Sequence, residues 1–203
     1  MEKRYISTRG KQESIDFYEA IIQGIGQDGG LIVPDFKLPV LDLNRLKDMS
    51  YVDLAATIFS HFMPSDIEDI KELCQKAYDS GLFIEGVVPV EKAGNTYIAE
   101  LFQGPTAAFK DMALSMLPHF MTYSLKQKGE ERKVMILAAT SGDTGKAALE
   151  GFKNVEGTCI KVFYPIDGVS PIQKQQMITQ EGHNVDVIGI RGNFDDAQTA
   201  VKK

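Results

Sequence analysis

The sequence has few residues of the kinds that build disulfide frameworks or metal sites. It contains two cysteines and three histidines among 203 residues. Cys74 falls on an expected polar helix and Cys159 opens an expected strand, and their spacing suggests neither a disulfide nor a ligand set. We interpret the scattered His61, His119 and His183 as packing or surface residues. The sequence therefore predicts no metal site, and two cysteines without a suggested partner are typical of a reducing compartment.

Long apolar runs and clusters of basic residues are also absent from the sequence. No apolar run approaches the roughly 18–20 residues that a membrane span needs, and the N-terminus, MEKRYISTRG, lacks the apolar core of a signal peptide. The 22 lysines and arginines are outnumbered by 28 acidic residues, which gives a net charge of −6, and they form no basic stripe. We therefore expect a cytoplasmic protein with neither a membrane nor a nucleic acid as its partner.

The remaining composition is that of an ordinary globular protein, and its pattern becomes regular in the second half. Apolar residues make up 43% of the sequence and charged residues 25%, which are usual proportions. From residue 134, short apolar stretches alternate with helical ones. Such alternation predicts parallel strands with right-handed crossovers and ligand sites at the carboxyl ends of the strands. We expect strands at 134–139, 159–164 and 185–190, and helices at 144–153, around 172–180 and from about 194.

The first hundred residues predict a mainly helical region that ends in a hairpin. Ser14 and Ser50 stand where they could cap helices, and Ser65 followed three places later by Glu68 fits a capping box. Two short strands, at 87–90 and 97–102, are expected on either side of a turn at 93–95. We therefore divide the chain into a mainly helical region with a hairpin, 1–100, and the start of an α/β core, 101–203.

One lysine stands out in the stretch Glu100–Asp111, which reads ELFQGPTAAFKD. Pro105 and Thr106 predict a helix start, and the residues that follow are apolar on most sides of that helix, which predicts burial. Lys110 would then lie on a largely buried helix, where an unpaired charge is costly. A neutral amine in such a place suits a covalent link to a carbonyl group. The plainer interpretation is a solvated surface lysine.

A second stretch, Ala139–Lys146, reads ATSGDTGK and joins an expected strand to an expected helix. Backbone N–H groups at a helix start can receive an anion or a ring substituent. The stretch is not a nucleotide-binding P-loop, because Thr140 stands where that motif needs its first glycine and Ala147 where it needs Ser or Thr. Its plainer interpretation is an ordinary strand-to-helix turn.

Together, the lysine and the small-residue loop suit one kind of cofactor. Pyridoxal 5'-phosphate is both an aldehyde, which condenses with a lysine amine, and a phosphate ester, which needs hydrogen-bond donors. The two stretches resemble the cofactor-lysine and cofactor-ring segments of the threonine synthase family. Four further segments resemble the same family, namely YISTRG (5–10), IGQDGGLIVP (25–34), YPIDGVSPIQKQQM (164–177) and GNFDDAQTAVKK (192–203).

The resemblance implies a fold, a reaction and a set of site residues. The fold is the α/β architecture shared with the β subunit of tryptophan synthase, called fold type II, and the reaction is a lyase reaction that converts O-phosphohomoserine and water to threonine and phosphate. Lys110 would bind the cofactor covalently and move protons, and the loop would hold the cofactor ring. In related enzymes an asparagine often stands at the position of Asp143, so the role of this aspartate stays open. The expected cofactor-binding residues are Lys110, Thr140, Ser141, Gly142, Asp143 and Thr144.

The family continues past the point where this sequence stops. Its later glycine-rich loop, with a serine and an asparagine that grip the cofactor phosphate, is not found after Gly192. We therefore expect the sequence to correspond to the N-terminal part of a threonine synthase, with an incomplete sheet and without activity by itself.

Two alternatives remain open. One is another fold type II pyridoxal enzyme, such as a threonine dehydratase-like protein, against which the N-terminal STRG and DGGL segments argue. The other is a homologous domain that binds no cofactor. The sequence does not indicate an oligomeric state.

Overall fold

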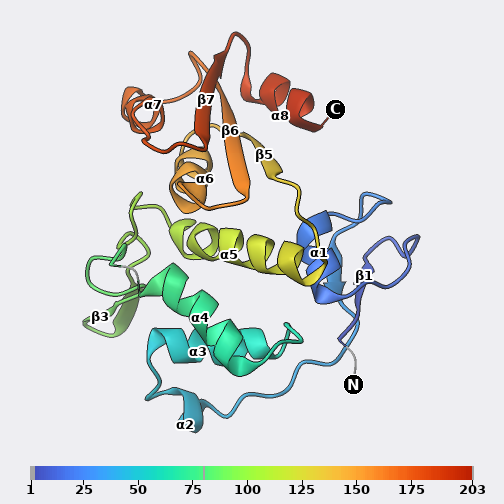
Figure 1. Cartoon of the computed structure of the whole chain (residues 1–203). Helices are drawn as coiled ribbons and strands as arrows, with labels where there is room; N and C mark the ends of the chain where they lie inside the picture. Colours follow the sequence, from blue (N-terminus) through green and yellow to red (C-terminus); the bar gives the residue numbers. More distant parts are fainter. Residues whose placement is uncertain (1–2, 80, 203) are drawn as a thin grey trace. The chain divides into compact units, whose positions relative to one another are not determined.

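The computed structural model describes residues 3–79 and 81–202 and divides them between two compact units. The first unit comprises residues 1–80 with 119–131, and the second comprises 81–118 with 132–203. Helix α5 (Asp111–Gln127) is shared, because its first part belongs to the second unit and its remainder to the first (Figure 1). The division at residues 100 and 101 that the sequence predicted stays a prediction.

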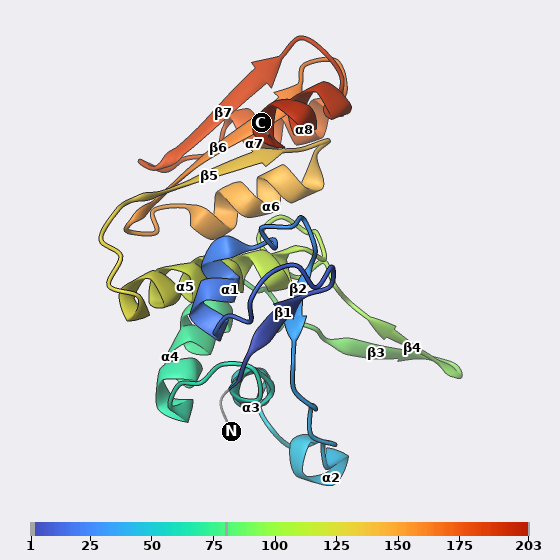
Figure 2. The same cartoon turned by 90° about the vertical axis from the view of Figure 1, so that its right-hand side faces the viewer.

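The first unit combines a small sheet with helices. Strands β1 and β2 pair antiparallel, with Tyr5 opposite Pro34, and they lie side by side in Figure 2. Helices α3 and α4 pack together around side chains such as Ile70 and Cys74, which are fully buried. Burial raises the pKa of the Cys74 thiol to about 11. The elements are β1 (Tyr5–Ser7), α1 (Phe17–Gln23), β2 (Ile32–Pro34), α2 (Leu43–Leu46), α3 (Tyr51–Ser60), α4 (Ile67–Tyr78) and the end of α5.

Of the three helix caps predicted in this unit, one is confirmed and two are wrong. The Ser50 hydroxyl caps α3 by accepting a hydrogen bond from the Asp53 N–H at 3.1 Å. Helix α1 is capped instead by Asp16, because Ser14 binds Arg4. Helix α4 begins after Asp66 without a side-chain cap, and the Ser65 hydroxyl pairs with the Tyr18 hydroxyl at 2.6 Å. Ser14 and Ser65 therefore do not cap these helices, because their hydroxyls form hydrogen bonds with residues elsewhere in the chain.

The second unit contains the predicted parallel sheet. Its strand order is β5-β6-β7, and both pairings are parallel. The predicted bounds of the first and last strands, 134–139 and 185–190, are confirmed. The elements are β5 (Val134–Ala139), α6 (Asp143–Phe152), β6 (Thr158–Pro165), α7 (Pro171–Ile178), β7 (Val185–Ile190) and α8 (Phe194–Lys202).

A hairpin precedes this sheet and differs from the predicted one. Strands β3 (Val90–Ala93) and β4 (Thr96–Ala99) replace the expected stretches at 87–90 and 97–102. The reason is a two-residue turn in which Gly94 has a φ of +62°, since this tight turn fixes the register by pairing Ala93 with Thr96. All eight strand residues are exposed.

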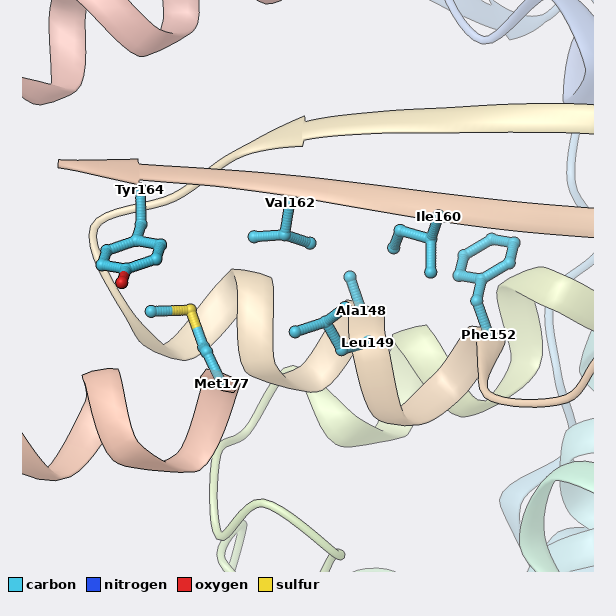
Figure 3. Close-up of a cluster of buried hydrophobic side chains, with 7 residues drawn as sticks. All are labelled: Ala148, Leu149, Phe152, Ile160, Val162, Tyr164 and Met177. Carbon is cyan, nitrogen blue, oxygen red and sulfur yellow. The ribbon is translucent and has the colours of Figure 1, made fainter. Parts of the chain in front are cut away.

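The core of the second unit lies between the sheet and helices α6 and α7. Leu149 and Phe152 of α6 pack against Ile160 and Val162 of β6, and all four are at most 1% exposed (Figure 3). Helix α8 lies across the sheet from α6 and α7 and contacts β5 and β6 (Figure 1). This packing fixes the start of α6, and with it the loop that follows β5. Among the described residues, no helix is long and apolar enough to cross a membrane.

Candidate functional site

A buried carboxylate builds the turn that carries Lys110. Asp111 is 2% exposed, and its two oxygens accept hydrogen bonds from the Thr106 N–H at 2.9 Å and from the Thr106 hydroxyl at 2.6 Å. The predicted helix start at Pro105 and Thr106 is therefore wrong, because this contact closes residues 106–111 into a turn and α5 begins at Asp111. Ala107 takes a φ of +56°, which no helix residue adopts.

A glycine makes this contact possible. A Cβ atom on Gly104 would lie 2.5 Å from Oδ2 of Asp111, which is closer than atoms can pack. The Gly104 carbonyl accepts a hydrogen bond from the Ala107 N–H at 3.0 Å. The Gly-Pro-Thr segment is therefore folded against the start of α5, and it fixes where the backbone of Lys110 lies.

Lys110 itself lies in the turn just before α5 and is half-buried. The expectation that it would sit within a buried helix is wrong for the same reason as the helix start. Its Nζ lies 4.4 Å from the ring centroid of Phe109, which is 62% exposed. Within residues 3–79 and 81–202 the ammonium group has no hydrogen bond or ion pair. The turn therefore presents an amine that lies against an aromatic ring and has no polar partner in the described part of the chain.

The loop from Thr140 to Thr144 lies at the carboxyl end of β5, as the strand–helix alternation predicted. The Thr140 side chain is buried, and its Oγ1 accepts hydrogen bonds from the N–H groups of Gly142 at 3.0 Å and Gly145 at 2.9 Å. Its own N–H donates to the Phe163 carbonyl at 3.0 Å. A Cβ on Gly145 would lie 2.4 Å from Cγ2 of Thr140. The Thr140 hydroxyl thus holds the loop, and Gly145, which has no Cβ, leaves room for the Thr140 side chain.

The outward side of the loop carries donors. Ser141, Asp143 and Thr144 are exposed, and in the described part of the chain their N–H groups have no hydrogen-bond acceptor. These groups sit at the start of a ten-residue helix, where the helix dipole favours negative charge. The loop can therefore receive an anionic or electron-rich group from outside.

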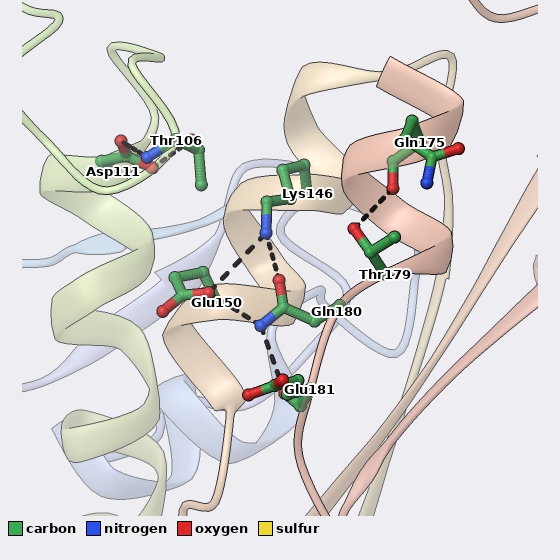
Figure 4. Close-up of polar contacts among 8 residues, drawn as sticks. All are labelled: Thr106, Asp111, Lys146, Glu150, Gln175, Thr179, Gln180 and Glu181. Atoms are coloured by element: carbon green, nitrogen blue, oxygen red, sulfur yellow. Dashed lines mark hydrogen bonds and ion pairs between the residues drawn. The ribbon is translucent and has the colours of Figure 1, made fainter. Parts of the chain in front are cut away.

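Lys146, the other lysine of these two stretches, is occupied by its neighbours. Its ammonium donates to Oε1 of Gln180 and lies 3.7 Å from a carboxylate oxygen of Glu150. Gln180 in turn donates to the same Glu150 oxygen at 2.8 Å (Figure 4). This closed network leaves Lys146 a structural role.

The two turns lie in the same compact unit and toward the same end of their helices. Helices α5 and α6 cross where a Cβ on Gly151 would lie 2.1 Å from the Leu114 carbonyl oxygen. Asp111, the first residue of α5, precedes Leu114 by three residues, and Asp143, the first residue of α6, precedes Gly151 by eight, which at 1.5 Å per residue is about 4.5 and about 12 Å along the helices. Figure 4 shows the starts of both helices pointing the same way. The Lys110 amine and the N–H groups of loop 141–144 therefore lie at the starts of α5 and α6, on the same side of the contact between the two helices.

Two supporting contacts escaped the sequence reasoning. Asp111 was noticed only as the neighbour of Lys110, although its position five residues after Thr106 fixes the turn. Gln173, 30 residues beyond Asp143, donates a hydrogen bond to that carboxylate at 2.7 Å. The pattern Ser170-x-x-Gln173 is a capping-box signal, but nothing in it points to Asp143.

Comparisons with known proteins bear on the origin of this arrangement. A family model described as the threonine synthase N terminus matches residues 4–78. Over 98% of its length the chain is 39% identical to the threonine synthase of Pseudomonas aeruginosa and 35% identical to that of Saccharomyces cerevisiae. It covers 43% and 42% of these two proteins, so it spans less than half their length. Over 92% of its length it is 37% identical to the mouse protein named threonine synthase-like 1, of which it covers 26%.

Solved structures agree with these sequences. The chain is similar to a crystal structure of PLP-bound threonine synthase from Brucella melitensis, with a TM-score of 0.88 and 36% identity over 99% of this chain and 44% of that one. It is equally similar to yeast threonine synthase, with a TM-score of 0.88 and 34% identity over 98% and 43% of the two chains. The resemblance and the fold class that the sequence predicted are confirmed.

Proposed function

Because the chain is homologous to threonine synthases along nearly its whole length, we propose that it supplies the lysine-bearing part of a pyridoxal-phosphate-dependent threonine synthase. The observation that carries the proposal is the amine of Lys110, which a locked turn presents without a polar partner among residues 3–79 and 81–202. The donor loop after β5 lies in the same unit. Lys110 and Thr140, Ser141, Gly142, Asp143 and Thr144 are the proposed site residues.

The described residues fit this cofactor in their chemistry. An unpaired lysine amine suits an aldehyde. The exposed N–H groups at the start of α6 suit the oxygen atoms of a ring substituent or a phosphate. Gly142 and Gly145 let the side chains of Gln173 and Thr140 pack against the loop backbone, which holds the loop in one conformation.

The proposal assigns a role in the reaction to Lys110 and to loop 140–144. The cofactor, when bound, supplies a carbonyl that condenses with amines and a ring that withdraws electrons from the substrate carbon. Nζ of Lys110 would hold the cofactor, and as a free amine it would remove protons from Cα and Cβ of the substrate and return protons to Cγ and Cα. The loop holds the ring through its N–H groups and the hydroxyls of Ser141 and Thr144. The Asp143 carboxylate places a hydrogen-bond acceptor beside it.

The proposed substrate is O-phosphohomoserine, which loses phosphate from Cγ and gains water at Cβ to give threonine. This reaction makes the enzyme a carbon–oxygen lyase. Its substrate and its activity rest on the homology with threonine synthases, of which the chain spans less than half.

The test is chemical labelling of the natural full-length protein. After incubation with pyridoxal 5'-phosphate, borohydride reduction should fix the cofactor to one peptide, and mass mapping should place it on Lys110. Lys110→Ala should abolish the label and Lys146→Ala should keep it. A label on Lys146, or none in the unsubstituted protein, would contradict the assignment.

A further inference from the structure

Gln173 lies at the start of α7 with its side chain folded back over the helix end. The Ser170 hydroxyl accepts a hydrogen bond from the Gln173 N–H at 3.2 Å, and Oε1 of Gln173 accepts from the Ser170 N–H at 3.3 Å and from its hydroxyl at 3.0 Å. This is a capping box with Pro171 in the first turn. The two acceptor contacts fix which end of the carboxamide is oxygen.

The other end of the carboxamide reaches the candidate cofactor loop. Nε2 of Gln173 donates to Oδ1 of Asp143 at 2.7 Å. Because Oε1 is occupied by Ser170, only the NH₂ group can face Asp143, and a carboxylate can only accept. The contact therefore has one orientation, and it sets the direction of the Asp143 side chain.

The same carboxamide also lies against the loop backbone. Gly142 has a φ of +148°, and a Cβ there would lie 2.5 Å from Cδ and from Nε2 of Gln173. The amide thus fills the space in which any other residue at 142 would carry a side chain. The Thr140 hydroxyl binds the Gly142 N–H, so both Gln173 and Thr140 hold this peptide in place.

Helix α7 is a firm support for this contact because it is fixed to α6 at both ends. Gln173 donates to Asp143 near the start of α7, and Gln180, two residues beyond the end of α7, donates to Glu150 at 2.8 Å. Gln180 also accepts from Lys146, and Figure 4 draws this second set of contacts between α6 and the end of α7. The position of Nε2 is therefore set by two helices packed together.

We infer that Gln173 is a positioning residue of the cofactor site, which aims the Asp143 carboxylate and holds the Gly142 peptide so that the loop receives the ring in one orientation. The inference rests on the proposed function, since it assigns Gln173 a task toward the cofactor that loop 140–144 is proposed to bind. Segment 164–177 resembles the threonine synthase family but contains none of the expected site residues. Through Gln173, this segment would take part in the site.

The substitution Gln173→Glu distinguishes the contact of Gln173 with Asp143 from its role in capping α7. Glutamate completes a capping box as well as glutamine does, so the start of α7 should stay intact. It replaces the donor that faces Asp143 by a second carboxylate, which repels the first. Adding Asp143→Asn to Gln173→Glu restores a donor opposite an acceptor. Gln176→Glu is the matched control, because Gln176 lies on the same helix, is exposed and has no side-chain hydrogen bond among the described residues.

The experiment measures the dissociation constant of pyridoxal 5'-phosphate and its absorbance spectrum for these variants of the full-length protein. A lost charge-assisted hydrogen bond predicts that Gln173→Glu weakens binding about tenfold and alters the spectrum. Gln176→Glu removes no hydrogen bond and should change the dissociation constant less than about twofold. The double variant Gln173→Glu with Asp143→Asn should recover most of the lost affinity. Melting curves should be the same for Gln173→Glu and Gln176→Glu, and in the cofactor-free protein Gln173→Glu alone should speed amide hydrogen exchange at residues 141–144.

Each other outcome has a distinct meaning. Equal cofactor affinity for Gln173→Glu and Gln176→Glu overturns the inference while the proposed function stands. Absence of rescue in the double variant also overturns it. If the unsubstituted protein binds no cofactor and Lys110 is not labelled, the proposed function fails and the inference with it. Faster exchange at 141–144 without any change in affinity would reduce Gln173 to a structural contact.

Discussion

The turns before α5 and before α6 are built by the same device and leave opposite groups free. Each turn has one buried acceptor side chain, Asp111 in the first and Thr140 in the second, which accepts two hydrogen bonds from its own turn. Each also has a glycine, Gly104 or Gly145, where a Cβ would collide with that side chain. Among the described residues, the first turn leaves the amine of Lys110 unpaired, whereas the second leaves backbone N–H groups unpaired.

The difference shows how two similar turns serve two tasks. In the first turn the acceptor, Asp111, comes from the helix and binds back to Thr106, so the backbone of Lys110, just before the helix, is held in place. In the second turn the acceptor comes from the strand end and reaches forward to Gly145, so the N–H groups at the helix start stay available. Together the turns offer a nucleophile and a set of donors, which a cofactor with an aldehyde and anionic groups requires.

Removing the amine should have the largest effect. In the full-length protein, Lys110→Ala should lower the rate of phosphate release from O-phosphohomoserine by at least about 10²- to 10⁴-fold, the usual worth of a general acid–base group. Lys146→Ala should be far milder, because Lys146 is held by Glu150 and Gln180. A phosphate assay on both variants checks this, and equal losses would remove the distinction between the two lysines.

Filling the two glycine positions should come next and should separate the tasks of the turns. Gly104→Ala and Gly145→Ala each force a methyl group into a buried side chain, which costs on the order of 1–3 kcal/mol in the free energy of unfolding. Gly104→Ala should reduce borohydride labelling of Lys110, and Gly145→Ala should reduce cofactor affinity. Denaturant unfolding and the two binding measurements check this, with the exposed Ala107→Gly as a tolerated control. Identical functional profiles for the two variants would show that the turns do not have separate tasks.

Removing the Thr140 hydroxyl should have a smaller and more local effect. Thr140→Val leaves the Gly142 and Gly145 N–H groups without their acceptor at a buried site, which should lower the free energy of unfolding by about 1–3 kcal/mol. Thr140→Ser keeps the hydroxyl and should lose less stability than Thr140→Val. If the two variants unfold at the same denaturant concentration, the hydroxyl does not hold the loop.

The smallest effect should come from a group outside both turns. Burial, and then the charge of Lys76, lower the pKa of His119 in the second part of α5 below its usual 6.5. The unfolded chain then binds the proton more tightly, so stability is fully present above about 6.5 and is lost as the pH falls toward the folded-state value. Urea unfolding from pH 7.5 to 5 should show this slope. The slope should diminish in His119→Gln and partly in Lys76→Met, and an unchanged slope in both would contradict the assignment.

The sequence predicted the sheet more completely than the turns. Strands β5 and β7 were located because their apolar runs end at turn residues, and such runs need no distant partner to be recognised. The start of α5 was misplaced because Asp111 acts on Thr106 through its side chain, which leaves no trace in periodicity. The contact of Gln173 with Asp143 bridges 30 residues and depends on how α7 packs on α6. The assignment of Lys110 as the cofactor lysine stays a prediction, to which the structure adds an amine that has no polar partner within residues 3–79 and 81–202.

The claim that the two turns form one cofactor site can be tested by following both in a single titration. Pyridoxal 5'-phosphate is added to the ¹⁵N-labelled protein, and the backbone amide resonances of residues 107–111 and 141–145 are recorded by NMR. We predict that both groups shift together and saturate with one dissociation constant. Shifts in only one of the two turns, or two different dissociation constants, would contradict the account.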